Sequence, residues 1–122
     1  MKKKSDLELK ALTDKVVNAV TSNFKVDEII LFGSYARGTA NDLSDVDIAV
    51  VCPELKEGQA MFKNVLSISR KSGLCEPYLQ LLAFPSRTYY NEESYIDPDF
   101  IREIKRTGKV LFSANQLLSE ST

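Results

Sequence analysis

The chain of 122 residues contains no histidine. Imidazole is the one side chain whose ordinary pKa lies close to neutral pH, so its absence removes a whole set of sites. His-dependent catalytic triads, imidazole general bases and His-ligated metals are excluded. Any chemistry must therefore use carboxylates, hydroxyls, Lys, Arg or Tyr.

Cysteine is scarce, and the two that occur are Cys52 and Cys75. Their spacing does not fit a zinc site, and two cysteines are too few for a disulfide scaffold. Both stand beside apolar residues in the sequence. We therefore expect both to be reduced core residues of a cytoplasmic protein.

The chain also lacks an excess of charge and any long apolar run. Sixteen basic and 17 acidic residues give a formal net charge of -1, which provides no general attraction to nucleic acid or anionic membrane but leaves room for a local basic patch. The basic start "MKKKSDLELK" is not followed by the apolar core of a signal peptide. No run approaches the roughly 20 apolar residues that span a bilayer. We expect no membrane contact.

What is present is typical of one soluble globular domain, with 43% hydrophobic and 27% charged residues. We expect a single domain over residues 1–122, with a core at about 26–112, an N-terminal helix at about 5–23 and a loose tail at about 113–122. The predicted elements after that helix are a strand over Ile29–Phe32, a short helix or turn in "SYARG", a strand in "DVDIAVVC", a helix in "EGQAMFKNVLSISRKSG", a strand in "YLQLLAF" from about Tyr78, a helix in "IDPDFIREIKRTGKVLF" and a short apolar piece at Val110–Phe112. This order predicts an α/β or α+β fold, a small sheet flanked by helices.

Two carboxylates open the second predicted strand. Because strand side chains alternate between faces, Asp45 and Asp47 in "DVDIAV" share one face and repel each other. Such a pair is costly unless a cation or a proton lies between the two groups. Mg²⁺ fits well, since it favours a few carboxylates together with phosphate oxygens. The alternative is a solvated strand end.

A glycine and a serine supply the complementary half. Gly33 ends the first predicted strand and lets backbone come close to a ligand, while free N–H groups at a following helix start favour a phosphate. The hydroxyl of Ser34 adds a further hydrogen-bonding group. A nucleoside triphosphate with Mg²⁺ satisfies both halves, with one metal ion or with two roughly 3.5–4 Å apart. The alternative is an ordinary turn.

The string "GSYARGTANDLSDVDIAVV" resembles the signature of the DNA polymerase β-like nucleotidyltransferases, which is Gly-Ser, about ten residues and then Asp-x-Asp at the start of a strand. Within that superfamily it is most similar to the minimal nucleotidyltransferases (MNT), many of which are encoded beside a helical HEPN partner. The segment "DPDFIREIKRTGKVLF" is similar to the closing part of the same family, so the resemblance covers about residues 26–112. It implies the polymerase β-like fold, a small mixed sheet flanked by helices.

The resemblance also implies roles for particular residues. Gly33 and Ser34 would hold the triphosphate, and Asp45 and Asp47 would be the catalytic residues that bind one or two Mg²⁺ ions. The reaction would transfer a nucleoside monophosphate from an NTP, expected to be ATP, to a hydroxyl of a partner protein or RNA. In the paired systems the nucleotidyltransferase is the antitoxin and adds AMP to the toxin. A HEPN-type partner or a second subunit would complete the cleft.

One position departs from the family pattern. Active members usually carry a third carboxylate on a neighbouring strand, and the matching string "LQLL" places Gln80 there. Gln is neutral and cannot accept a proton, and losing a general base costs about 10²–10⁴ in rate. Glu76 is the nearest alternative, although Pro77 interrupts the strand between them. Two hypotheses follow: an active enzyme, or a catalytically weak module that binds nucleotide, a helical HEPN-type partner or both.

Three further features have two readings each. Arg37 in "SYARG" either contacts nucleotide phosphates or pairs with a nearby aspartate. A cluster of basic residues near the last predicted helix is either a solvated helix end or a patch for RNA or a partner: Arg102, Lys105, Arg106 and Lys109. Four tyrosines around the third predicted strand offer a stacking surface, although at least two of them should pack in the core or an interface: Tyr78, Tyr89, Tyr90 and Tyr95.

Overall fold

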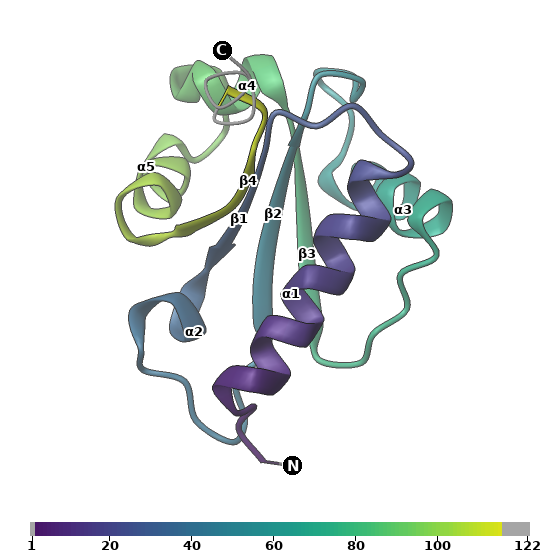
Figure 1. Ribbon diagram of the computed structural model, residues 1–122. Coiled ribbons are helices and arrows are strands. Elements are labelled where there is room, and N and C mark those ends of the chain that lie inside the picture. Colours follow the sequence, from purple (N-terminus) through teal and green to yellow (C-terminus); the bar gives the residue numbers. More distant parts are fainter. Residues whose placement is uncertain (1, 116–122) are drawn as a thin grey trace.

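The computed structural model describes residues 2–115. A four-stranded sheet in the order β3-β2-β1-β4 has helices on both faces (Figure 1). This arrangement confirms the expected small mixed sheet flanked by helices. The strands are β1 (Glu28–Phe32), β2 (Val46–Cys52), β3 (Leu79–Pro85) and β4 (Lys109–Ser113). The helices are α1 (Asp6–Thr21), α2 (Gly33–Arg37), α3 (Met61–Ser72), α4 (Ser86–Tyr90), the short 3₁₀ helix η1 (Glu92–Ser94) and α5 (Pro98–Thr107).

Strand directions follow from the connections between them. β1 pairs antiparallel with both β2 and β4, whereas β2 and β3 run parallel. A parallel pair needs a crossover connection, and α3 supplies it between β2 and β3. Consequently the start of β2, the start of β3 and the end of β1 lie at the same end of the sheet.

The sheet separates two cores. On one face α1 and α3 pack against β2 through Val46, Ile48 and Val50. On the other face Ala49 and Val51 of β2 pack with residues of α4 and α5. The alternation predicted for "DVDIAV" is therefore confirmed, and Asp47 belongs to the face that carries α4 and α5.

The first helix begins as its sequence predicts. Ser5 is the N-cap of α1, and its hydroxyl accepts a hydrogen bond from Glu8 N while the Glu8 carboxylate accepts one from Ser5 N. This capping box satisfies two backbone donors that the first helical turn would otherwise leave unpaired. No helix within residues 2–115 has the length and apolarity that crossing a membrane requires.

The structure differs from the sequence expectations in three places. The segment after β3 forms α4 and η1, which no periodicity predicted because both are shorter than two helical turns. Cys52 is buried, but Cys75 is exposed in the connection after α3, so the expectation that both are core residues is wrong for Cys75. β4 extends through Ser113, and residues 116–122 of the expected tail lie outside the described residues.

Candidate active site

The sheet register brings the two halves of the predicted site together. Asp47 in β2 is the pairing partner of Phe32, the last residue of β1. Gly33 and Ser34 follow Phe32 directly as the first residues of α2. The glycine-serine turn and the aspartate pair therefore meet at one end of the sheet, although ten residues separate them in the sequence.

Within the glycine-serine turn, Gly33 is the residue that packs against Asp47. Its backbone has φ +74°, a left-handed conformation that residues with a Cβ rarely adopt. A Cβ at this position would also overlap Oδ2 of Asp47. Glycine is required here on both counts, because the Asp47 carboxylate packs directly on its Cα.

The two aspartates form a site of concentrated negative charge. Asp47 is half-buried and Asp45 is exposed. Burial raises the pKa of Asp47, the charge of Asp45 raises it further, and the charge of Arg37 partly offsets both effects. Within residues 2–115 no Lys or Arg lies at ion-pair distance from either carboxylate. A bound cation would remove this repulsion.

A cavity of about 300 Å³ lies beside Asp47, and Asp45 is not among the residues that line it. Its strand side and its α2 side contain the predicted residues Gly33, Ser34, Arg37 and Asp47, together with Phe32. Its remaining wall comes from α5 and consists of Phe100, Glu103, Ile104 and Thr107. Sequence reasoning missed this wall. The spacing of Glu103 and Thr107 marks one helix face, but nothing local says that this face lies against α2.

Gln80 lies where the departure from the family pattern was expected. In the parallel pair of β2 and β3 it is the register partner of Asp47, so both side chains are on the same face of the sheet. Gln80 is exposed. Glu76, the alternative carboxylate, lies in the turn before β3 and pairs with Lys15 of α1. It is not among the residues that line the cavity.

The donor set fits a metal only in part. Within the described residues no group of three or more Asp, Glu, Cys or His side chains is placed to hold an ion. Two carboxylates remain, Asp45 and Asp47. Mg²⁺ is commonly held by one or two carboxylates while phosphate oxygens and waters supply its other ligands. The pair therefore suits an ion that arrives with a triphosphate.

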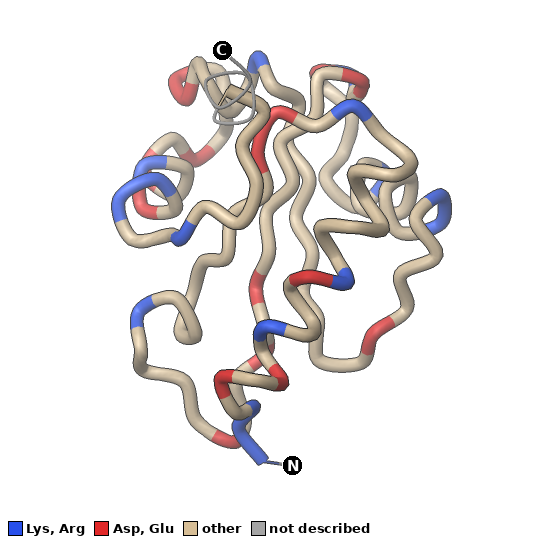
Figure 2. Tube along the Cα trace, in the orientation of Figure 1, with Lys and Arg blue, Asp and Glu red and all other residues tan. Residues whose placement is uncertain are grey.

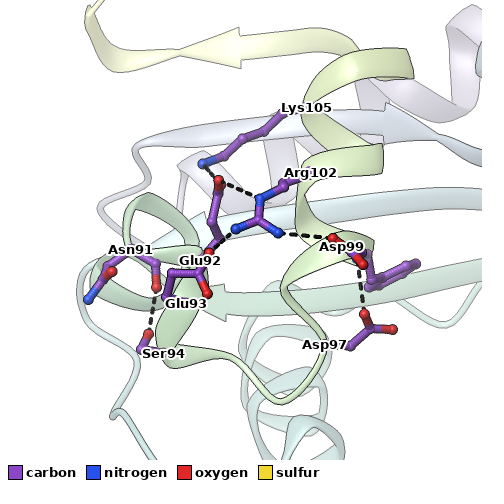
Figure 3. Close-up of polar contacts among 9 residues, drawn as sticks. Asn91, Glu92, Glu93, Ser94, Asp97, Asp99, Arg102 and Lys105 are labelled. Atoms are coloured by element: carbon purple, nitrogen blue, oxygen red, sulfur yellow. Dashed lines mark hydrogen bonds and ion pairs between the residues drawn. The ribbon is translucent and has the colours of Figure 1, made fainter.

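The basic cluster on α5 is largely neutralised by neighbouring acids (Figure 3). Arg102 pairs with Asp99 at 2.9 Å, with Glu92 at 3.1 Å and also with Glu93. Lys105 pairs with the same Glu92 at 2.7 Å, and this hydrogen bond is the main cause of the lowered pKa of Glu92. Figure 2 shows both charge signs along α5. These contacts favour the solvated helix face over a patch for RNA.

The tyrosines divide into core and surface groups. Tyr89 and Tyr95 pack around Phe84, with ring centroids 5.9 and 5.4 Å from its ring. The expectation that at least two tyrosines pack is confirmed. The Tyr90 hydroxyl donates a hydrogen bond to Oε2 of Glu28. The ring of Tyr78 is left at the surface, 51% exposed, at the end of the sheet that carries the two aspartates.

A larger cavity of about 430 Å³ lies at the opposite end of β3. Phe84, Pro85 and Tyr95 form part of its lining, to which no charged side chain of the described part of the chain contributes. Asn64 of α3 is buried there, and its Oδ1 has no hydrogen-bond partner among residues 2–115. The larger space thus lacks the charged groups that phosphoryl chemistry requires, and the smaller cavity beside Asp47 has them.

Comparison with known proteins agrees with this geometry. The family described as "Nucleotidyltransferase domain" matches residues 13–110. The Methanocaldococcus jannaschii protein named "Putative protein adenylyltransferase MJ0604" is 33% identical over 98 residues, which cover 79% of this chain and 90% of that protein. A second protein of the same organism, "Putative protein adenylyltransferase MJ0141", is 50% identical over 42 residues, covering 32% of this chain and 42% of its own length.

Solved structures share the fold. The crystal structure of a "putative nucleotidyltransferase from Sulfolobus solfataricus" superposes with a TM-score of 0.61 at 23% identity, covering 88% of this chain and 81% of that one. A "toxin-antitoxin with AMP-PNP" superposes with a TM-score of 0.53 at 22% identity, covering 85% and 75%. The family match spans most of the chain and includes the glycine-serine turn, both aspartates and α5. The chain belongs to the nucleotidyltransferase domain family.

Proposed function

We propose that the chain transfers a nucleoside monophosphate from Mg²⁺-bound ATP to a hydroxyl group of a partner protein. One observation carries this proposal: the carboxylate of Asp47 packs on Gly33, so the glycine-serine turn and Asp47 border the same cavity, and Asp45 precedes Asp47 by two residues. Neither half would be sufficient alone, because a glycine-serine turn and a strand-end aspartate are both common. Together they match the two ends of a metal-bound triphosphate.

Each residue has a distinct role in this proposal. The backbone at Gly33 and the hydroxyl of Ser34 would bind the terminal phosphates, and Arg37 on the same cavity would add a positive charge. Asp45 and Asp47 would hold Mg²⁺. When bound, the ion would neutralise charge on the transferring phosphate and favour the attacking oxygen as its deprotonated form.

The proposed reaction exchanges one P–O bond for another. The acceptor hydroxyl loses its proton to solvent, and its oxygen forms a bond to the α-phosphorus of ATP. The bond between that phosphorus and the oxygen bridging to the β-phosphate breaks, and pyrophosphate leaves toward Gly33 and Ser34. Asp47 and its register partner Gln80 lie on the face where the acceptor would arrive. Gln80 can hydrogen-bond the hydroxyl but cannot take its proton.

Two observations support ATP and a protein acceptor. The relative that this chain matches over 90% of its length is named as a putative protein adenylyltransferase. The ion pairs of Arg102 and Lys105 leave little free positive charge on α5 for an RNA backbone. An antitoxin role toward a HEPN-type partner is a further part of the proposal, with the fold shared by a toxin-antitoxin structure as its background.

Labelled nucleotides test the proposal directly. The protein is incubated with Mg²⁺, with α-labelled ATP, GTP, CTP or UTP in turn, and with the product of its adjacent gene. We expect label from ATP to reach the adjacent-gene product, and to be lost when Asp45→Asn or Asp47→Asn replaces the wild type. Label that transfers equally with both variants would contradict the proposed site.

Gln80 supports a second candidate function. With no carboxylate at this position the chain could bind nucleotide and partner without turnover, as a regulatory module. Calorimetric titration of Mg·ATP separates the two candidates. Binding of ATP without transfer under any condition favours the module, and the absence of any binding contradicts both.

A further inference from the structure

Tyr78 adopts a backbone conformation that its side chain disfavours. Its φ is +74°, and among residues 2–115 it is the one residue other than glycine with a positive φ. The N–H of Leu79 donates to the carbonyl oxygen of Glu76 at 3.3 Å, which closes a four-residue turn with Pro77 in its second position and Tyr78 in its third. Proline second and a positive φ third are the features of a type II turn, whose third position strongly favours glycine.

Within the described residues, no interaction of the Tyr78 side chain offsets this unfavourable backbone conformation. It is 51% exposed, and within the described residues it takes part in no side-chain hydrogen bond and no ring stacking. A bulky residue in such a conformation is destabilising, and residues of this kind cluster at functional sites. Contacts within the described residues therefore do not account for a tyrosine at this position, and a contact with another molecule would.

The turn is fixed beside the aspartate pair. Val46 lies between Asp45 and Asp47, and its N–H donates to the carbonyl oxygen of Tyr78 at 2.8 Å. On the other side of the turn, the ion pair of Glu76 with Lys15 ties it to α1. The backbone of Tyr78 is thus held beside the start of β2, which carries the two aspartates, and Tyr78 lies two residues before Gln80.

The β3 side is where an acceptor has to approach. The cavity that contains Gly33 and Ser34 lies on the β1 side of Asp47, and the proposed leaving pyrophosphate occupies it. In such a transfer the attacking and the leaving oxygens lie on opposite sides of the phosphorus. The attacking hydroxyl therefore comes from the β3 side, past Tyr78. Within the described residues β3 is an edge of the sheet, so no further strand blocks this path.

We propose that Tyr78 is a specificity-determining residue whose ring packs against the hydroxyl-bearing polypeptide segment of the acceptor. This inference rests on the proposed function, because it takes the direction of attack from the transfer reaction. An aromatic side chain supplies a large, rigid contact surface at low entropic cost, which suits recognition of an extended segment. The strained turn leaves Tyr78 exposed at the surface, where such a segment can reach its ring.

Three variants separate this role from a structural one. Tyr78→Gly removes the ring and relieves the backbone, Tyr78→Ala removes the ring alone, and Tyr78→Phe keeps the ring. For each, thermal unfolding, calorimetric Mg·ATP affinity, affinity for the adjacent-gene product, and KM and kcat for labelling that product are measured. Release of labelled AMP to water is the acceptor-independent control.

We expect Tyr78→Gly to unfold at a higher temperature than the wild type and Tyr78→Ala not to do so. Both should raise KM for the protein acceptor, or weaken binding of the adjacent-gene product, at least about tenfold. Affinity for Mg·ATP and AMP release to water should not change, and Tyr78→Phe should resemble the wild type. Unchanged acceptor KM and unchanged partner affinity in Tyr78→Gly would overturn the inference, as would an equal loss of ATP affinity. A wild type that binds no ATP defeats the proposed function instead, and partner affinity still tests Tyr78.

Discussion

The β1 side and the β3 side of Asp47 differ in how many of the residues expected of an active site they contain. On the β1 side, Gly33 provides the only kind of residue that fits, Ser34 and Arg37 border a cavity, and α5 closes its wall. On the β3 side, the register partner is the neutral and exposed Gln80, and the next feature is the strained turn at Tyr78.

If the proposed function is correct, this difference predicts that nucleotide binding and turnover are separable in this chain. The proposed nucleotide side consists of backbone and charged groups that the register of β1 and β2 and the packing of α5 bring together within this chain. The proposed acceptor side has an exposed Tyr78 and the neutral Gln80 opposite Asp47, so we expect a docked partner to complete it. Variants on the two sides should therefore fail in different ways.

The largest effect is expected from Asp47→Asn. Losing one of two carboxylate ligands should reduce nucleotidyl transfer at least about a hundredfold, since metal stabilisation of the transferring phosphate contributes several kcal/mol. The unfolding temperature should not fall, because the substitution removes charge repulsion from Asp45. Labelling kinetics and calorimetry on the same preparations measure both quantities. An unfolding temperature of Asp47→Asn below that of the wild type would indicate a structural role for Asp47.

Gly33→Ala should damage both the fold and the binding side. The left-handed backbone and the overlap with Oδ2 of Asp47 together should lower the free energy of unfolding by about 2 kcal/mol or more. Mg·ATP affinity should fall as well, because the carboxylate has to move. Gly58→Ala is a matched control, since Gly58 has φ +76° but open space around its Cα. Equal losses in the two variants would exclude any contribution from the Asp47 contact.

Gln80→Asp should increase the rate of nucleotidyl transfer, because it adds a carboxylate on the β3 side of Asp47. A carboxylate at this position would lie beside Asp47 and could accept the proton of the attacking hydroxyl. We expect kcat to rise about 10- to 100-fold, within the range that general bases contribute. Gln80→Leu, which removes the amide without adding a charge, should show no such gain. If Gln80→Asp transfers no faster than the wild type, the missing carboxylate does not limit turnover.

The raised pKa of Asp47 should affect the pH dependence of both the free energy of unfolding and Mg·ATP binding. Its folded pKa is raised above the unfolded value, so its protonated form is favoured by folding. Its stabilising contribution is therefore present below the unfolded pKa and is lost as pH rises through the raised folded pKa. Without Mg²⁺, this contribution should appear as the difference between the wild-type and Asp47→Asn stability curves, and that difference should fall as pH rises through the window. The comparison with the variant is needed because Glu8 and Glu92, whose pKa values are lowered, give the opposite trend in both proteins. Mg·ATP binding should show the opposite trend and strengthen as Asp47 ionises.

The smallest effect is expected from Arg102→Ala, on the surface of α5. Its ion pairs are solvent-exposed, and their loss should change the free energy of unfolding by no more than about 1 kcal/mol. Label transfer should stay at the wild-type rate, because Arg102 does not line the cavity. A large loss of transfer would assign the α5 cluster to the acceptor side.

Much of the candidate site could be predicted from short patterns of consecutive residues. Alternation along "DVDIAV" assigned Asp45 and Asp47 to one face, and the glycine-serine turn after an apolar strand indicated a phosphate site. The position of Gln80 beside Asp47 also agrees with the expectation drawn from "LQLL". These features depend on a few consecutive residues and on two strands, so their spacing in the sequence is sufficient.

Three features could not be read in this way, because contacts between distant segments determine them. Glu103 and Thr107 line the cavity only because α5 packs beside α2. Arg102 and Lys105 lose their apparent basic character to Glu92, which lies ten or more residues away in the sequence. The left-handed φ of Tyr78 depends on a turn fixed by β2 and α1. Local periodicity determined which residues face a site, and tertiary packing decided what stands opposite them.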